Sequence, residues 1–600
     1  MAKSELSFPE RKKAAMYAKV DIMQRKVARL LVILMLCVQP LYLNQERYIS
    51  LTHHKWVFFV VCMCFILLVA MIIWAVRMAR NPKLFPQDRL SLVDWAVLGF
   101  AAVTMLSALL SQINGFVFDY YFDGEGRVFS SWIGSPERND GAITQLLYVS
   151  IFFIVSRWYR PKIKDFMLFG IAASIVAIIG ILQFYGMDFL NLWPHNLEPV
   201  DNYFNIQFRT TLGNTNIVST YVSVAIMLCG FLFIKIKSKW QPLWLVASAL
   251  NFWLMDFGGA DSGVVGIMAA MFIGIPFIVE NFKTLGRFLI LASSWAAVFT
   301  LQRLLFHVNI LVIRTPGSLL PFVAAVIILL AFGLVLLVIG KKRDSDAISD
   351  ETLDATSNAT SNTSPDAISN AAFKATPDTS DASDASDASP DSPSDASPNS
   401  SSDAPPDAPI KWKLGVILMA ACLVVALIGV EVAGRPDAET GVGAGMIYEA
   451  REILHGNIRD EFGTNRIYIW RHALALFPDN PIIGSGPDTF RFVFPPEAQF
   501  RYDEFYENAH NEYIHILVSQ GILGLLAYLV FLGGIFLKAV PISFRNPLVA
   551  VILVAFTCYC AQAFFNLSLP ITSQILWVFA GMLASKRFRE TPLSELVAER

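Results

Sequence analysis

Charged residues are scarce in this chain. Only 16% of the 600 residues are Asp, Glu, Lys or Arg, whereas soluble proteins average about 25%. Hydrophobic residues make up 55% of the chain, and the mean hydropathy is +0.51. This composition excludes an ordinary soluble domain. The net charge of −2 leaves no excess positive charge to attract nucleic acid, so we expect no nucleic-acid partner.

Cysteine is missing from the polar stretches. All seven cysteines lie in apolar segments, at Cys37, Cys62, Cys64, Cys229, Cys422, Cys558 and Cys560. A disulfide framework is therefore not expected. Cys62 with Cys64, and Cys558 with Cys560, have i,i+2 spacing. On a helix this spacing points the two side chains to different faces, so a metal site built from either pair is not expected.

Long apolar runs dominate the remainder. A membrane-spanning helix needs about 20 apolar residues, and fourteen segments approach or exceed that length. They are residues 27–43, 56–76, 92–113, 142–156, 165–185, 216–234, 242–257, 263–280, 288–306, 318–340, 414–432, 513–537, 547–566 and 570–585. The first segment lacks the small-residue pattern of a cleavable signal peptide. We predict an all-α polytopic membrane protein with 12–14 transmembrane helices and a large extracytoplasmic loop.

Lysine and arginine concentrate in alternate connections between these segments. The basic groups lie in residues 77–89, 157–164, 235–239, 341–343 and 586–589. Cytoplasmic loops carry this excess, so we expect a multi-pass protein of the cell membrane with both termini in the cytoplasm. Residues 433–512 then lie on the outer face.

One stretch cannot form a core. Residues 344–410 hold fourteen acidic residues and one lysine, Lys374, with Asp-Ala-Ser repeats. Such a segment is expected to be disordered, as a cytoplasmic linker or as a docking site for a cytoplasmic partner. The predicted organisation is an N-terminal transmembrane bundle (1–343), this acidic loop (344–410), a transmembrane helix (411–432), an extracytoplasmic catalytic loop (433–512) and C-terminal transmembrane helices with a short cytoplasmic tail (513–600).

Charged residues are nearly absent from the middle of the apolar segments. Ion-coupled transporters usually carry intramembrane charges along their pathway, and the chain has no clear internal repeat of the kind that many transporters show. A channel or pump is therefore disfavoured. A lipid flippase remains an alternative.

The outer polar stretches contain arginines just ahead of apolar helices. Arg138 lies near the end of the stretch 114–141, and Arg209 lies near the end of the stretch 186–215. Helix N-termini present free N–H groups and partial positive charge, which suit phosphate, and an arginine fork can hold two phosphate oxygens. The alternative is that both arginines are interfacial anchors or helix caps.

The third outer stretch combines an amphipathic helix with a polar cluster. Residues 466–476 place Ile467, Trp470, Ala473 and Leu474 on one predicted stripe, with Arg466 beside it. The stretch ends in Glu507-Asn-Ala-His510-Asn-Glu-Tyr513. Histidine can accept a proton near neutrality, although a lone interfacial histidine is usually structural. His510 and His515, five residues apart, do not form a zinc-ligand pair.

Several of these motifs together resemble the O-antigen ligase and polymerase superfamily of bacterial envelope membrane proteins, which includes protein O-oligosaccharyltransferases. The motifs are Glu137-Arg-Asn-Asp-Gly141, Arg209-Thr-Thr-Leu-Gly-Asn-Thr-Asn216, Arg466-x3-Trp470-Arg-His-Ala-Leu474, Asn480-Pro-Ile-Ile-Gly-Ser-Gly-Pro-Asp-Thr-Phe490 and Ala509-His-Asn-Glu-Tyr-Ile-His-Ile-Leu517 with Gln520-Gly-Ile-Leu-Gly-Leu-Leu526. The chain departs from the family at Gly259-Ala-Asp-Ser-Gly263, where many relatives carry a Ser-Arg-Gly-like turn.

The resemblance implies a C-type glycosyltransferase that needs no metal or other cofactor. Its donor would be a glycan carried on undecaprenyl diphosphate, which lies among the membrane lipids. The glycan would be transferred en bloc to an acceptor outside the cytoplasm. That acceptor would be lipid A core or a protein such as a surface-layer glycoprotein. His510 would be the general base or would orient the acceptor. Arg209 and Arg466 would clamp the diphosphate, with Arg138 and Arg471 as weaker members. A repeat-unit polymerase is the alternative within the same fold.

Overall fold

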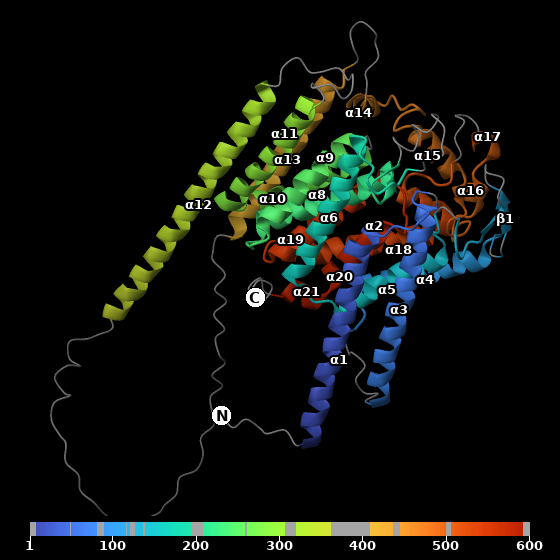
Figure 1. Cartoon of the computed structure of the whole chain (residues 1–600), viewed down its shortest axis with the longest axis horizontal. Helices are drawn as coiled ribbons and strands as arrows, with labels where there is room; N and C mark the ends of the chain where they lie inside the picture. Colours follow the sequence, from blue (N-terminus) through green and yellow to red (C-terminus); the bar gives the residue numbers. More distant parts are fainter. Residues whose placement is uncertain are drawn as a thin grey trace, which may run out of the picture.

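The structure is a computed structural model of the whole chain (Figure 1). It describes residues 8–48, 50–80, 89–113, 115, 117–120, 126–135, 138–193, 208–258, 261–305, 320–361, 408–435, 445–499 and 506–591. The greater part of the predicted acidic linker, residues 362–407, lies outside the described residues. Its first part does not: α12 continues to Ser361, so residues 344–361 are helical.

Each of the fourteen apolar segments coincides with a helix. They are α1 (Phe8–Ile33), α3 (Leu51–Arg80), α4 (Leu92–Leu110), α5 (Ala142–Trp158), α6 (Ile163–Phe184), α8 (Thr215–Lys235), α9 (Gln241–Gly258), α10 (Asp261–Ile278), α11 (Phe282–Leu305), α12 (Leu320–Ser361), α13 (Ala408–Ala433), α18 (Glu512–Ser543), α19 (Pro547–Gln562) and α20 (Ser573–Ala584). Within the described part of the chain, nine helices are long and apolar enough to cross a membrane. The predicted all-α polytopic class is confirmed.

Short elements complete the fold. A π-helical turn, η1 (Leu34–Val38), and α2 (Gln39–Leu41) extend α1, and α21 (Lys586–Glu590) follows α20. Two antiparallel hairpins, β1 (Val117–Tyr120) with β2 (Gly126–Phe129) and β3 (Phe208–Arg209) with β4 (Gly213–Asn214), are the strands of the described chain.

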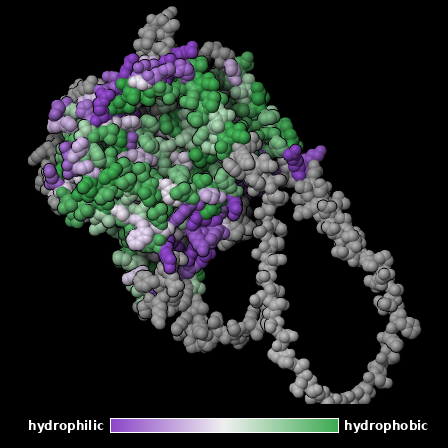
Figure 2. Space-filling view, turned by 180° about the vertical axis from the view of Figure 1, so that it is seen from behind, coloured by the Kyte–Doolittle hydropathy of each residue, from purple (hydrophilic) through white to green (hydrophobic). Residues whose placement is uncertain are grey.

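Helix α8 is the centre of the bundle. The window of α8 that could span a membrane is buried along its whole length, and the helix packs against α9, α10 and α19. Helices α4 and α18 pack together beside it, as do α5 and α20. The core therefore joins helices from both halves of the sequence. Figure 2 shows a broad hydrophobic area on one face of the molecule, with hydrophilic residues gathered above and below it.

The polar stretch between α13 and α18 folds at one end of the bundle. Its helices are α14 (Met446–Leu454), α15 (Arg466–Ala475), η5 (Phe477–Asp479), α16 (Phe490–Val493) and α17 (Pro496–Gln499) (Figure 1). The predicted stripe of α15 is partly wrong: Tyr468, Ile469 and Ala473 are buried, whereas Leu474 is 47% exposed. The helix is turned so that Tyr468 joins an aromatic cluster with residues of α16, which periodicity alone does not reveal.

Helix α18 is broken at Gly521, whose φ of 67° and ψ of −169° lie outside the helical region. Such a break frees amide and carbonyl groups that must find partners inside the protein. Here the loop before α16 supplies them. The backbone bonds are Ser485 N to Val518 O (3.0 Å), Gly486 N to Ser519 O (2.9 Å), Ile522 N to Pro481 O (2.9 Å) and Leu523 N to Ile482 O (3.3 Å). The loop and the broken helix therefore form one interlocked unit.

Helix α4 holds this unit from the other side. Ser107 Oγ donates to the carbonyl oxygen of Ser519 at 2.8 Å, and Ser111 Oγ donates to that of Ser485 at 2.7 Å. Both hydroxyls are buried. The Ser519 carbonyl oxygen already accepts the bond from Gly486 N, so Ser107 uses its second lone pair. The Ser485 carbonyl belongs to a residue whose N–H is itself bonded to Val518 O. The position of the loop is thereby set relative to the N-terminal half of the chain.

We predict that Gly521→Ala destabilises the protein. A Cβ at this position would lie 2.4 Å from the carbonyl carbon of Ile482, and the backbone conformation itself favours glycine. The expected loss in the free energy of unfolding is about 2–5 kcal/mol, measured by thermal unfolding in detergent. Gly533→Ala is the control, because no atom lies within 4 Å of its added Cβ and α18 is helical there. Equal melting temperatures for the two variants would contradict the interlock.

Candidate functional site

His510 lies in the turn that leads into α18. Its φ is 45°, in the left-handed region, and asparagines hold it on both sides. Asn508 Oδ1 accepts from the His510 N–H at 2.7 Å. Asn511 caps α18 by accepting from the N–H groups of Tyr513 (3.0 Å) and Ile514 (3.1 Å). The polar residues beside His510 therefore fix its backbone at the start of a helix.

The indole of Trp470 reaches the same turn from α15. Its Nε1–H donates to the carbonyl oxygen of Ala509 at 2.9 Å. The contact joins the motif around Arg466 to the motif around His510, which the sequence separates by about forty residues. The two motifs therefore form one site.

The imidazole of His510 is neutral. Burial, together with the positive charges of Arg466 and Arg138, lowers its pKa from the ordinary value of 6.5 to about 3. Nδ1 is buried and has no hydrogen-bond partner among the described residues. The site therefore holds a neutral imidazole under the influence of two positive guanidinium groups, in a region that favours negative charge.

Arg138 is anchored by a carboxylate that sequence reasoning did not single out. Its Nε donates to Asp488 Oδ1 at 2.9 Å, and the two side chains are 4% and 0% exposed. Asp488 Oδ2 also accepts from the N–H groups of Ser135 (2.8 Å) and Asp140 (3.3 Å). Asp488 follows the interlocked loop directly, so the loop positions Arg138. The Nη2 of Arg138 is buried with no hydrogen-bond partner among the described residues.

The turn around Asp488 is tightly packed. A Cβ added at Gly134 would lie 2.4 Å from Asp488 Oδ2. Asp140, in the same turn, has its pKa raised by burial first and then by the charge of Asp488. The stretch Gly134–Gly141 is therefore a tight cradle for one carboxylate, which explains its combination of glycines and polar residues.

The other three predicted arginines differ in their surroundings. Arg466 begins α15, and its Nη1 donates to the carbonyl oxygen of Gly463 (2.7 Å) and to Thr464 Oγ1 (2.9 Å). Arg471 is 60% exposed and pairs with Asp460 at 2.9 Å. Arg209 lies in β3, and its side chain is outside the described part of the chain. The structure thus brings Arg138 and Arg466 to His510 and directs Arg471 to a different partner.

A buried network lies behind His510. Glu512, the first residue of α18, accepts from the hydroxyl of Tyr528 at 2.5 Å and lies 3.5 Å from that of Tyr559. The Tyr559 hydroxyl donates to Ser573 Oγ at 3.1 Å, and Ser568 Oγ lies 2.9 Å from Ser573 Oγ. In the sequence, Glu512 belongs to the polar cluster around His510, whereas Ser568 is marked only by the polar break between the apolar segments 547–566 and 570–585.

The same break contacts the segment that carries Arg209. Asn566 Nδ2 donates to the carbonyl oxygen of Asn216 at 2.8 Å and to Thr220 Oγ1 at 2.7 Å. Asn214, at the end of β4, caps α8 by accepting from the Asn216 N–H at 2.8 Å. The start of α8 is therefore tied to the polar network behind His510.

His515 is a further buried histidine that sequence reasoning set aside. It is 6% exposed, neither ring nitrogen has a hydrogen-bond partner among the described residues, and the ring centroid lies 5.8 Å from that of Phe490. It packs between the helix and the aromatic cluster. In the part of the chain that the structure describes, no three His, Cys, Asp or Glu side chains gather as a metal site would require.

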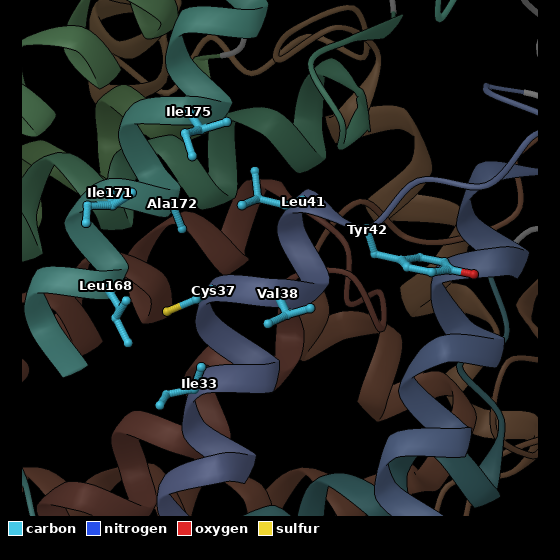
Figure 3. Close-up of a pocket in the computed structure, with 9 residues that line it drawn as sticks. All are labelled: Ile33, Cys37, Val38, Leu41, Tyr42, Leu168, Ile171, Ala172 and Ile175. Carbon is cyan, nitrogen blue, oxygen red and sulfur yellow. The ribbon is translucent and has the colours of Figure 1, made fainter. Parts of the chain in front are cut away.

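An apolar groove runs between α1–η1–α2 and α6, with a volume of about 350 Å³. Figure 3 shows residues of α6 facing residues of η1 and its neighbours across the groove. The lining residues are Ile33, Cys37, Val38, Leu41, Tyr42, Leu168, Ile171, Ala172 and Ile175. The groove therefore offers an apolar chain a surface of hydrocarbon side chains.

One end of the groove contacts the β3–β4 hairpin. Lys55 Nζ donates to the carbonyl oxygens of Gln39 (2.8 Å), Pro40 (3.1 Å) and Tyr42 (2.8 Å), and so fixes the end of α2. Thr211 Oγ1 donates to the Pro40 carbonyl oxygen at 2.6 Å. Thr211 is two residues from Arg209, and Pro40 precedes the lining residue Leu41, so a hydrogen bond ties the hairpin to the helix that forms one wall of the groove.

Comparison with known families agrees with this arrangement. Residues 408–529 match the family model described as O-antigen ligase, a range that contains Arg466, Asp488, His510 and the break at Gly521. A search of curated proteins found no match to the chain. The matched domain supports the O-antigen ligase superfamily for this chain, and together with the apolar helices it indicates a multi-pass membrane protein.

Proposed function

We propose that this protein transfers a glycan from a polyprenyl diphosphate to a hydroxyl group of an acceptor outside the cytoplasm. The observation that carries the proposal is the neutral imidazole of His510 held near two guanidinium groups. A base that is not protonated and a positively charged surface for phosphate are the two groups that such a transfer needs. The match to the O-antigen ligase family model supports the glycan donor.

The proposed reaction is a single displacement at the anomeric carbon. A bond forms between the acceptor oxygen and the sugar C1, and the bond between C1 and the diphosphate oxygen breaks. The acceptor proton passes to a ring nitrogen of His510, and the electron pair leaves with the diphosphate. General-base assistance contributes about 10²–10⁴-fold. Each charge-assisted contact to the leaving group contributes about 1.5–3 kcal/mol, so two or three arginines are as important as the base.

The arginines have unequal roles in this proposal. Arg466 and Arg209 hold the diphosphate. Arg138 adds positive charge, but its ion pair with Asp488 offsets part of that charge. Arg138 therefore acts mainly by positioning. Arg471 is left out of the clamp because its exposed side chain pairs with Asp460. Glu512 and its tyrosines keep the start of α18, and with it His510, in place.

The proposed orientation follows from the direction of the helices. Helices α5, α8 and α18 all begin at the site, whereas α5 and α8 end at basic residues, Arg157 and Lys235. Basic residues favour the cytoplasmic side. The site therefore faces outward, and both termini lie in the cytoplasm.

The groove between α1 and α6 is our proposed position for the polyprenyl chain. Its lining is apolar, and its end contacts the hairpin of Arg209. A chain lying there would leave its diphosphate beside the proposed clamp. The lipid-linked donor would then be held at both ends.

The acceptor separates a ligase from a polymerase. A ligase moves the finished glycan to lipid A core or to a protein such as a surface-layer glycoprotein, whereas a polymerase moves it to another lipid-linked unit. Deleting the gene distinguishes them: long lipid-linked glycans accumulate without a ligase, and single repeat units accumulate without a polymerase. We propose the ligase reaction as the leading assignment, and this deletion experiment tests it.

We predict that His510→Ala lowers glycan transfer by about 10²–10⁴-fold, because the proton acceptor is lost. The measurement is transfer by the purified protein in liposomes that contain a lipid-linked donor. His455→Ala, at a 48% exposed histidine of the outer stretch, is the control and should stay within about twofold of the unaltered protein. Full transfer by His510→Ala would exclude His510 as the base, and donor transport without any transfer by the unaltered protein would indicate a flippase.

The low pKa of His510 predicts a particular pH dependence. Because the folded pKa is depressed, the imidazole stays neutral as the pH falls through the ordinary value of 6.5. We expect kcat/KM to show no loss from His510 between pH 8 and about pH 5. Binding of the diphosphate adds negative charge and raises this pKa, so the acid limb of kcat should lie above that of kcat/KM.

Two variants test whether His510 is the group that produces these acid limbs. Arg466→Gln removes a charge that lowers the pKa of His510, so its acid limb should move to higher pH. Asp140→Asn removes a carboxyl group of the turn around Asp488 whose pKa is raised, and it should leave the His510 limb in place. A kcat/KM limb near 6.5 in the unaltered protein that Arg466→Gln moves to higher pH would assign that limb to His510 and contradict its low pKa.

The groove is tested with two residues of α6. Ile175 lines it and is 40% exposed, whereas Ile178 is 43% exposed and does not line it. We predict that Ile175→Trp fills the groove and raises KM for a long-chain polyprenyl donor about tenfold or more, since several buried methylenes are displaced at about 0.8 kcal/mol each. Ile178→Trp should leave KM unchanged. A donor with a short, soluble chain should not distinguish the two variants, and equal KM values for the long-chain donor would remove the groove from the proposal.

A further inference from the structure

A second pocket lies at the end of the bundle away from His510. Its volume is about 210 Å³, and α1, α3, the end of α5 and α21 contribute to it. The lining residues are Gln24, Arg77, Ser156, Arg157, Trp158, Lys586 and Arg587. Four of these seven side chains are cationic, and none is acidic. The pocket therefore has a strong preference for an anion.

Two of the four cations are held in place by carboxylates that lie outside the lining. Arg157 Nη2 is 2.9 Å from Asp94 Oδ1, and Arg587 Nη1 is 3.0 Å from Asp21 Oδ1. Arg77 and Lys586 make no ion pair with any described residue. The pairs fix the walls of the pocket, while the charges of Arg77 and Lys586 remain uncompensated.

The depth of the pocket matches that of lipid phosphates. Helix α5 begins at the site and ends at Trp158 after 17 residues, which is a rise of about 25 Å, and the hydrocarbon layer is about 30 Å thick. Figure 1 places α21 on the far side of the bundle from α15 and α17. Trp158, half-buried in the pocket wall, is the residue type that favours the membrane–water boundary.

Apolar side chains continue from the pocket along the membrane-facing helices. Trp74, one turn before Arg77 on α3, is 54% exposed. Ile22 and Met23, next to Gln24 on α1, are 50% and 51% exposed. An anion bound here would have hydrocarbon surface beside it, which a free phosphate does not use and an acyl chain does.

We propose that this pocket binds the phosphate headgroup of an anionic phospholipid from the adjacent leaflet, with the acyl chains lying on α1 and α3. Basic pockets between helices on the cytoplasmic side are suited to such headgroups. The bound lipid links α1 and α3, at the start of the chain, to α21 near its end. This site is separate from the proposed glycan transfer and does not depend on it.

The test compares lipids that differ only in headgroup charge. The purified full-length protein in detergent is titrated with phosphatidylglycerol or with phosphatidylcholine of the same acyl chains, and bound lipid is counted by native mass spectrometry. We expect phosphatidylglycerol to bind and to raise the melting temperature, and phosphatidylcholine to do neither. Arg77→Gln with Lys586→Gln should weaken the binding about 30-fold, since each cation near a membrane surface contributes a factor of about five.

The control variant is Lys341→Gln with Lys342→Gln, two exposed cations of α12 outside the pocket. It should bind phosphatidylglycerol as the unaltered protein does. The proposal is overturned if the Arg77/Lys586 variant retains the same affinity, if both variants lose it equally, or if inorganic phosphate raises the melting temperature as much as the lipid. The last result would indicate a soluble phosphate site instead. A variant that fails to fold is replaced by Lys586→Gln alone, for which about fivefold weaker binding is expected.

Discussion

At Gly521 the backbone of α18 leaves the helical path, and the amide and carbonyl groups released there bond to residues 481–486. Unpaired groups at this depth would each cost several kcal/mol, so neither the break nor the loop is stable without the other. Two residues beyond the loop stands Asp488, which fixes Arg138. His510 lies in the turn just before the start of the same broken helix. The position of Arg138 relative to His510 therefore depends on one backbone interlock.

Charge is arranged around His510 in two layers. Arginines lie close enough to depress its pKa, while Asp488 and Glu512 lie behind, each occupied by hydrogen bonds from tyrosines, arginine or backbone N–H groups. The carboxylates thus position neighbouring groups and are not exposed to compete with an anionic ligand. The positive charge near His510, which the proposed diphosphate site requires, is therefore kept even though the whole chain carries a net charge of −2.

Periodicity and length were sufficient to predict the helices, because a membrane helix must be apolar for about 20 residues whatever it packs against. They were not sufficient for α15, where contacts with an aromatic cluster decide which face is buried. His510, Arg138 and Arg466 were predicted from local motifs, and the structure places them together. Asp488, Tyr559 and Ser573 were missed because their roles come from contacts between segments far apart in the sequence. Residue types at one position carry no information about such contacts.

The central position of α8 has a consequence for biosynthesis. Thr220 of α8 donates to Gln562 of α19 at 3.0 Å and accepts from Asn566, yet α19 begins more than three hundred residues after α8 ends. At about 5–20 residues per second, the ribosome finishes α8 at least 15 seconds or so before its partner is made. The polar face of α8 must spend that interval in lipid, in the translocon or beside a membrane chaperone. Helix α19 therefore enters between elements that are already in the membrane, and the contacts that tie α8 to it form only after that interval.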